Sequence, residues 1–121
     1  MGCDVEQVAD WDEASARQYF NKHEYADIIS QPSAAARSER FFRYWTLKES
    51  FMKATGLGFS MPLRSFRITL GDTVCVHQSV DPRAFRFQEF ADLEGYKCAL
   101  CVAGEERHQA KLLMVDLRDA T

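Results

Sequence analysis

The stretch SAAARSERFFRYWTLKESFMKATG, residues 33–56, contains the longest periodic pattern in the chain. Apolar side chains recur through it at helical spacing, among them Phe41, Trp45 and Phe51. Gly56 can adopt the left-handed conformation that closes a helix. The sequence therefore predicts one long helix over this stretch.

Shorter patterns surround this helix. Two short helices are expected before it, at residues 12–20 and 23–30. Alternating or apolar runs bounded by turn residues predict strands at residues 2–8, at 65–70 paired with 73–77, at 84–90 and at 96–103, with 111–117 as a last short strand or packing arm. This order predicts a single α+β domain over residues 1–121, with a mostly antiparallel sheet of three to four strands packed against the long helix.

Composition narrows the classes of function. A formal net charge of −3 and the lack of a Lys/Arg run argue against a general nucleic-acid binder. No apolar run approaches the roughly 18 residues that span a membrane, and the first residues do not resemble a signal peptide. Cys98 and Cys101 form a lone C-x-x-C in an apolar run, which favours buried thiols over a zinc or redox site. We therefore expect a protein of the reducing cytosol.

Three acidic residues on two predicted elements can approach one cation. Asp4 and Glu6 are two apart in a strand, so their side chains point to the same face. Glu49 shares a helical face with Trp45 and Lys53. Such carboxylates, together with water and phosphate oxygens, suit Mg²⁺. The pattern fits displacement at phosphorus, with a carboxylate taking the proton of the nucleophile.

The same residues also admit a structural interpretation, which the spacing alone favours. Asp4 and Glu6 could form a solvated strand face. Glu49 and Lys53 could be an ordinary surface pair of a helix, which contributes only about 0.2–0.5 kcal/mol.

Two separated motifs favour the metal-site interpretation over the structural one. GCDVE, residues 2–6, and WTLKESFMKATG, residues 45–56, resemble the two-part signature of the Sfp-type 4'-phosphopantetheinyl transferases, G-[IV]-D-[IVL]-E followed by W-[ST]-x-K-E-[AS]-x-x-K-x-x-G. Residues 20–25, 58–63 and 95–99 resemble other landmarks of that family. Cys3 is a departure, because Ile or Val is usual there.

The resemblance implies a fold and a reaction. The chain would be the C-terminal half of the pseudo-twofold phosphopantetheinyl transferase fold. The reaction would be the Mg²⁺-dependent transfer of 4'-phosphopantetheine from coenzyme A to a serine of an acyl or peptidyl carrier protein, in the cytoplasm. The carrier could serve fatty acid, polyketide or nonribosomal peptide biosynthesis.

The resemblance also implies roles for individual residues. Asp4, Glu6 and Glu49 would ligate magnesium, and Glu49 would act as the base on the carrier serine. Lys53 would contact the phosphates and could donate a proton to the leaving group. Lys48 would help to hold the phosphates of coenzyme A.

The segment after the acidic strand is where the family usually docks its acidic carrier proteins. Docking contacts could come from Gln7, Trp11, Arg17 and Phe20, although residues such as Trp11, Arg17 and Phe20 are more often simply core or surface residues. Trp45 is interpreted as a packing anchor that fixes the helix over the site.

The chain is shorter than the usual members of the family that its motifs resemble. Enzymes of this type usually consist of two similar halves in one chain, with the coenzyme A pocket at the seam. The related acyl carrier protein synthases have about this length and form homotrimers. We therefore expect a fragment or shortened gene product of doubtful activity alone, which forms a homodimer or higher oligomer through the exposed seam.

Two other interpretations stay open. One is a non-catalytic module, derived from the transferase, that binds a carrier protein without transfer. The other is a structural α+β domain in which the motifs occur by chance.

Overall fold

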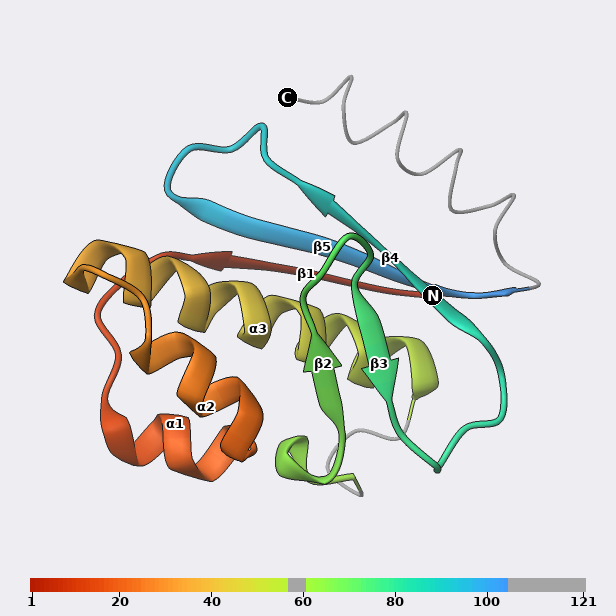
Figure 1. Cartoon of the computed structure of the whole chain (residues 1–121). Coiled ribbons are helices and arrows are strands. Elements are labelled where there is room, and N and C mark those ends of the chain that lie inside the picture. Colours follow the sequence, from red (N-terminus) through yellow and green to blue (C-terminus); the bar gives the residue numbers. More distant parts are fainter. Residues whose placement is uncertain (57–60, 105–121) are drawn as a thin grey trace.

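The computed structural model describes residues 1–56 and 61–104. Figure 1 shows their arrangement. The predicted strand at residues 111–117 lies outside the described residues. In chain order the elements are β1 (Gly2–Gln7), α1 (Glu13–Tyr19), α2 (Lys22–Ile29), α3 (Ala34–Thr55), the short 3₁₀ helix η2 (Leu63–Ser65), β2 (Arg67–Thr69), β3 (Cys75–His77), β4 (Phe85–Phe90) and β5 (Tyr96–Ala103).

The main sheet has three antiparallel strands in the order β1-β5-β4. Ala99 of the central strand pairs with Asp4 on one side and with Glu89 on the other. The predicted pairing of residues 65–70 with 73–77 is present as β2 and β3, which form a separate two-stranded sheet. The expectation of an α+β fold with an antiparallel sheet against a long helix is confirmed.

Helix α3 is the central element of the fold. It packs against β1 and β5 of the main sheet, and α2 packs against it in turn. In Figure 1, α1 and α2 lie on the side of α3 that faces away from the main sheet. The largest group of buried apolar side chains lies around this helix and contains Ala16, Phe20, Ile28, Phe41, Tyr44, Leu47, Ile68 and Ala99.

The ends of the helices follow from local sequence. Ser33 accepts a hydrogen bond from the amide of Ala36 at 3.1 Å, and Gly56 closes α3 with a φ of 71°. Asn21 and Glu24 form a reciprocal capping box, so α2 begins at Lys22, one residue before the predicted start. The position of Gly56 at the end of α3 confirms the predicted end of the long helix.

Gly2 allows β1 to lie directly on α3. A Cβ atom added at Gly2 would lie 2.2 Å from the carbonyl oxygen of Ser50 and 2.4 Å from the amide nitrogen of Ala54. No side chain fits in that space, because both neighbours are backbone atoms of the helix. The N-terminal end of β1 is therefore held against the last turns of α3.

Asp27 joins α2 to α3. Its carboxylate accepts hydrogen bonds from Tyr44 and Arg40 of α3. Burial alone would raise the pKa of Asp27, but these hydrogen bonds, the charge of Arg40 and a further hydrogen bond from Gln31 together hold the pKa below its ordinary value of 3.8.

The cysteines agree with the sequence expectation. Cys98 and Cys101 are buried in β5, and none of the four cysteines, all of which lie in the described residues, forms a disulfide. Burial, together with the neighbouring Cys3, raises the pKa of the Cys98 thiol to about 11. Among the described residues, no helix combines the length and apolar character needed to cross a bilayer.

Replacing Gly2 by Ala tests the close approach of β1. We expect Gly2→Ala to lower the free energy of unfolding by about 1–3 kcal/mol, because the added methyl group forces the strand off the helix backbone. Urea denaturation measures this change. Gly71→Ala is the matched control, because a Cβ there meets nothing nearer than the Thr73 carbonyl oxygen at 3.8 Å. Equal midpoints for the two variants would contradict the close approach.

Replacing Tyr44 by Phe tests the bond to Asp27 and its pH dependence. A carboxyl group whose folded pKa is lowered stabilises the protein above its unfolded pKa, and this stabilisation is lost as the pH falls through the folded pKa. We therefore expect Tyr44→Phe to cost about 1 kcal/mol at pH 7 and progressively less below pH 3.8.

Urea denaturation at pH 7 and at about pH 3 measures this difference. Tyr96→Phe, at a residue with 43% exposure, is the control and should change stability little at either pH. A cost of Tyr44→Phe that is the same at both pH values would rule out the ionised Asp27 as its origin.

Candidate functional site

Alternate residues of β1 face α3 and meet charged or polar partners there. Asp4 lies against Lys53, whose ammonium donates to the Asp4 carboxylate at 2.8 Å. Glu6 accepts a hydrogen bond from the indole N–H of Trp45 at 3.1 Å. The side chain of Asp4 is only 7% exposed, so the interpretation of this residue as part of a solvated strand face is wrong.

Charge and burial act together on the carboxylates. Burial raises the pKa of Glu49, and the nearby charges of Asp4 and Glu6 raise it further against the opposing effect of Lys53. Burial also raises the pKa of Glu6, with Asp4 adding to this and the Trp45 hydrogen bond opposing it. The three carboxylates therefore repel one another, and a further positive charge would stabilise their ionised forms.

One carboxylate oxygen lacks a partner. The Oδ2 atom of Asp4 is buried and accepts no hydrogen bond, although a buried polar atom of this kind normally has one. A cation could satisfy it. Mg²⁺ suits such a place, because it binds carboxylate oxygens and completes its coordination with water and phosphate oxygens.

The carboxylates are not gathered into a ready-made cage. Within residues 1–56 and 61–104, no three His, Cys, Asp or Glu side chains converge as ligands of one metal ion. Asp4 and Glu6 are instead held by Lys53 and Trp45. The donor types and the unpartnered oxygen fit magnesium, whereas the full ligand set of Asp4, Glu6 and Glu49 stays a prediction.

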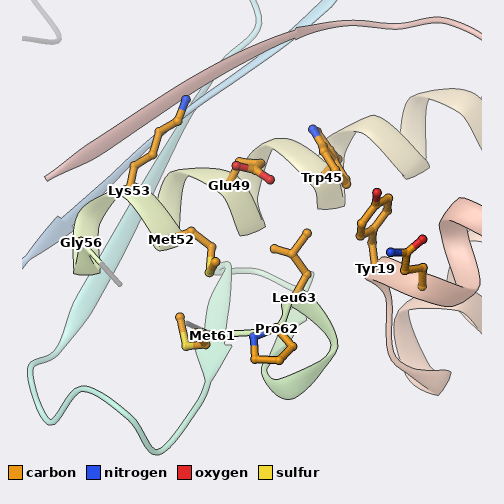
Figure 2. A pocket seen from close by; sticks show the side chains of 10 residues that line it. Tyr19, Trp45, Glu49, Met52, Lys53, Gly56, Met61, Pro62 and Leu63 are labelled. Carbon is orange, nitrogen blue, oxygen red and sulfur yellow. The ribbon is translucent and has the colours of Figure 1, made fainter. Parts of the chain in front are cut away.

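A cleft of about 710 Å³ opens beside these residues. Figure 2 shows Trp45, Glu49 and Lys53 along α3, with Met61, Pro62 and Leu63 on the opposite wall. The cleft is mostly apolar. A group that binds there would therefore be shielded from water, and it would lie next to the carboxylate of Glu49. The arrangement can hold an apolar chain while charged groups act at its rim.

The sequence did not identify every residue of this cleft. Tyr19 of α1 and Met52 of α3 both line it. The helical period could have indicated Met52, which follows Glu49 by three positions. No signal in the sequence connects Tyr19 with Glu49, because their proximity depends on how α1 packs.

Trp45 has two roles in the structure. Its ring packs edge-on against Tyr19 with centroids 4.8 Å apart and lies parallel to Phe41 at 6.5 Å. These contacts agree with a packing anchor. The hydrogen bond to Glu6 adds an orienting role that was not expected.

The structure does not bring Lys48 to the cleft. Its side chain has no exposure, and its ammonium lies 2.7 Å from the carboxylate of Glu24. The carbonyl oxygens of Leu63 and Phe66 accept its other hydrogen bonds. This burial corrects the expectation that Lys48 holds the phosphates of coenzyme A, because an enclosed ammonium cannot reach them.

The four expected docking residues divide by exposure. Gln7 and Arg17 are exposed, and Arg17 pairs with Glu13 of the same helix at 3.7 Å. Trp11 is half-buried and stacks on Phe41 at 5.1 Å. Phe20 is 2% exposed, so it belongs to the core and not to a docking surface.

Comparison with known proteins shows the family of this chain. A family model described as the 4'-phosphopantetheinyl transferase superfamily matches residues 1–101. The chain is 33% identical over 102 residues to the 4'-phosphopantetheinyl transferase gsp of Aneurinibacillus migulanus, which covers 84% of this chain and 43% of that protein. It is 31% identical over 107 residues to the 4'-phosphopantetheinyl transferase Sfp of Bacillus subtilis, with 85% and 46% covered. The chain thus spans less than half of the length of these relatives.

Solved structures share the fold at lower identity. A holo-(acyl-carrier-protein) synthase from Bacillus anthracis, in complex with CoA (3',5'-ADP), has a TM-score of 0.71 at 13% identity and covers 84% of this chain and 92% of that one. The holo-[acyl-carrier-protein] synthase of Thermotoga maritima has a TM-score of 0.68 at 22% identity, with 84% and 61% covered. The family model that matches residues 1–101, together with the related transferases of Aneurinibacillus migulanus and Bacillus subtilis, shows that the chain belongs to the 4'-phosphopantetheinyl transferase superfamily.

Proposed function

We propose that this chain supplies the metal-binding and catalytic half of an enzyme that transfers 4'-phosphopantetheine from coenzyme A to a serine of a carrier protein. The observation that carries this proposal is the buried, unpartnered oxygen of Asp4, which lies close to the charges of Glu6, Glu49 and Lys53 at the rim of the cleft. Membership of the transferase superfamily supports it.

Magnesium is part of the proposal. Asp4, Glu6 and Glu49 would hold the ion, and when bound it would neutralise the charge of the pyrophosphate of coenzyme A. The mutual repulsion that raises the pKa values of Glu6 and Glu49 supports this assignment, because a cation relieves that repulsion.

Glu49 and Lys53 would act on the reacting groups. Glu49 lines the cleft, so its carboxylate lies where a group bound there could give up a proton to it. It would take the proton of the serine hydroxyl as the serine oxygen replaces the adenosine-bisphosphate group on phosphorus. The half-exposed ammonium of Lys53 would bind phosphate oxygens and can protonate the leaving group.

A complete coenzyme A site would need a second half of the fold. The relatives are more than twice as long as the part that this chain matches, which supports a missing half supplied by further sequence or by a second copy of this chain. We propose self-association in the absence of that half. Light scattering that gives a clean monomer would count against it.

The cytosol is the proposed compartment, and the absence of a disulfide among the four cysteines supports it. The carrier would come from fatty acid, polyketide or nonribosomal peptide synthesis. Labelling one carrier protein of each kind would distinguish these pathways.

Carboxylate variants test the metal and the base. We expect Asp4→Asn and Glu49→Gln each to lower the transfer of fluorescent phosphopantetheine to a carrier protein by about 100-fold or more, because a ligand or the base is lost. Glu39→Gln is the control, since Glu39 is an exposed carboxylate of the same helix. EDTA should abolish transfer by the unaltered chain, and Mg²⁺ should restore it.

The assay is run with and without an added N-terminal half from a relative. Transfer that persists in EDTA would refute the metal assignment. Carrier binding without transfer, unchanged by the added half, would favour a non-catalytic binding module.

Replacing Trp45 by Phe tests its role in orienting Glu6. The phenyl ring keeps most of the packing but removes the N–H that Glu6 accepts. We expect Trp45→Phe to weaken the binding of Mn²⁺, used as a spectroscopic substitute for Mg²⁺, by about 10-fold, as is usual when a partner of a metal ligand is lost. Trp11→Phe is the control. Unchanged Mn²⁺ affinity in Trp45→Phe would show that the hydrogen bond does not matter for the metal.

A further inference from the structure

Lys48 and Glu24 form an ion pair that is closed off from solvent. Both side chains have no exposure, and the ammonium lies over the rings of Phe20 and Phe66, at 5.8 and 4.6 Å from their centroids. Removing two charges from water is costly unless each hydrogen-bonding atom finds a partner. A buried ion pair of this kind adds little to the stability of the folded chain. Its contacts with other groups therefore indicate what the pair does.

Every proton of the ammonium has an acceptor. A lysine ammonium has three donors, and here they meet the carboxylate of Glu24 and the carbonyl oxygens of Leu63 and Phe66. No donor is left for a ligand. The two carbonyls belong to the segment that contains η2 and leads into β2.

Glu24 connects the same segment to α2. One of its oxygens accepts the backbone amide of Asn21 at 3.1 Å, and the other accepts the amide of Ile68 in β2 at 2.8 Å. The Asn21 side chain also donates to the carbonyl of Phe66 at 3.3 Å. The pair therefore ties α2, α3 and the chain from Leu63 to Ile68 at a single point.

That segment forms a wall of the cleft beside Glu49. Pro62 and Leu63 line the cleft opposite α3, as Figure 2 shows. Lys48 precedes Glu49 in the sequence, so one turn of α3 presents Glu49 to the cleft and fixes the opposite wall through its neighbour. The distance between Glu49 and that wall then depends on the buried pair.

We infer that Lys48 and Glu24 are positioning residues that set the width of the cleft beside Glu49, in place of the contact with coenzyme A that the motif implied. The inference rests on the proposed transfer function for its kinetic consequence only. The structural consequence can be measured without any activity.

The first experiment measures the cleft wall directly. Trp11 and Trp45 are the two tryptophans of the chain, so a Trp11→Phe background leaves Trp45, which lines the cleft, as the sole probe. In this background we compare the acrylamide quenching of Trp45 in Glu24→Gln, in Lys48→Met and in the double variant. The variant Glu39→Gln serves as the control.

We expect each single variant to raise the quenching constant of Trp45 by about twofold, because an unpaired buried group loosens the wall. The double variant should stay below the sum of the two single variants, since no charge is then left unpaired, but above the unaltered value, because the carbonyls of Leu63 and Phe66 have lost their donor. Glu24→Gln keeps the measurement possible if Lys48→Met does not fold. Quenching that is unchanged in both single variants, or a double variant that equals the sum of the two, would overturn the inference.

The second experiment separates positioning from phosphate binding. For a positioning pair, Glu24→Gln should lower kcat by about 10-fold to 100-fold, as expected for a small misplacement of reacting groups. The KM for coenzyme A and its dependence on salt should hardly change. The double variant should regain part of kcat, because the unpaired charge is gone while the bonds from Lys48 to the wall are still missing.

A phosphate contact predicts the opposite result. Lys48→Met would then raise the KM for coenzyme A, weaken its salt dependence, and show no rescue in the double variant. That outcome would overturn the inference. If the unaltered chain transfers nothing under any condition, the proposed function fails, while the quenching experiment still decides the structural role.

Discussion

The close approach of β1 to the last turns of α3 underlies the whole site. Two backbone segments meet with no room for a side chain at Gly2, so the strand has one position on the helix. Because side chains alternate along a strand, fixing Gly2 also fixes Asp4 and Glu6 toward α3. The hydrogen bonds to Lys53 and Trp45 are consequences of that placement.

Two lysines of one motif have opposite environments. Lys48 and Lys53 are five positions apart on α3, and that spacing puts them on different sides of a helix. Lys53 remains half-exposed beside Asp4, where a phosphate could reach it. Lys48 is enclosed with Glu24 and holds the structure around the cleft. A motif that contains both lysines thus combines a site residue with an internal support.

The placement of the site's carboxylates lowers the stability of the folded chain. Burial and mutual repulsion raise the pKa values of Glu6 and Glu49, and one oxygen of Asp4 has no partner. Such features destabilise a protein unless a ligand compensates for them. They support the proposed binding of a cation and of phosphate groups.

Much of this protein could be predicted from its sequence, because the signals were local. Periodicity and the glycine at its end gave helix α3, and alternation gave β1, since both patterns depend on neighbouring residues. The shared face of Asp4 and Glu6 follows from the geometry of any strand. The tertiary structure decided the rest: the burial of Lys48 and Phe20, the bond from Trp45 to Glu6, and the cleft between α3 and Leu63. These depend on contacts between residues distant in the chain, and no spacing rule shows which neighbour a side chain will meet once the core has packed.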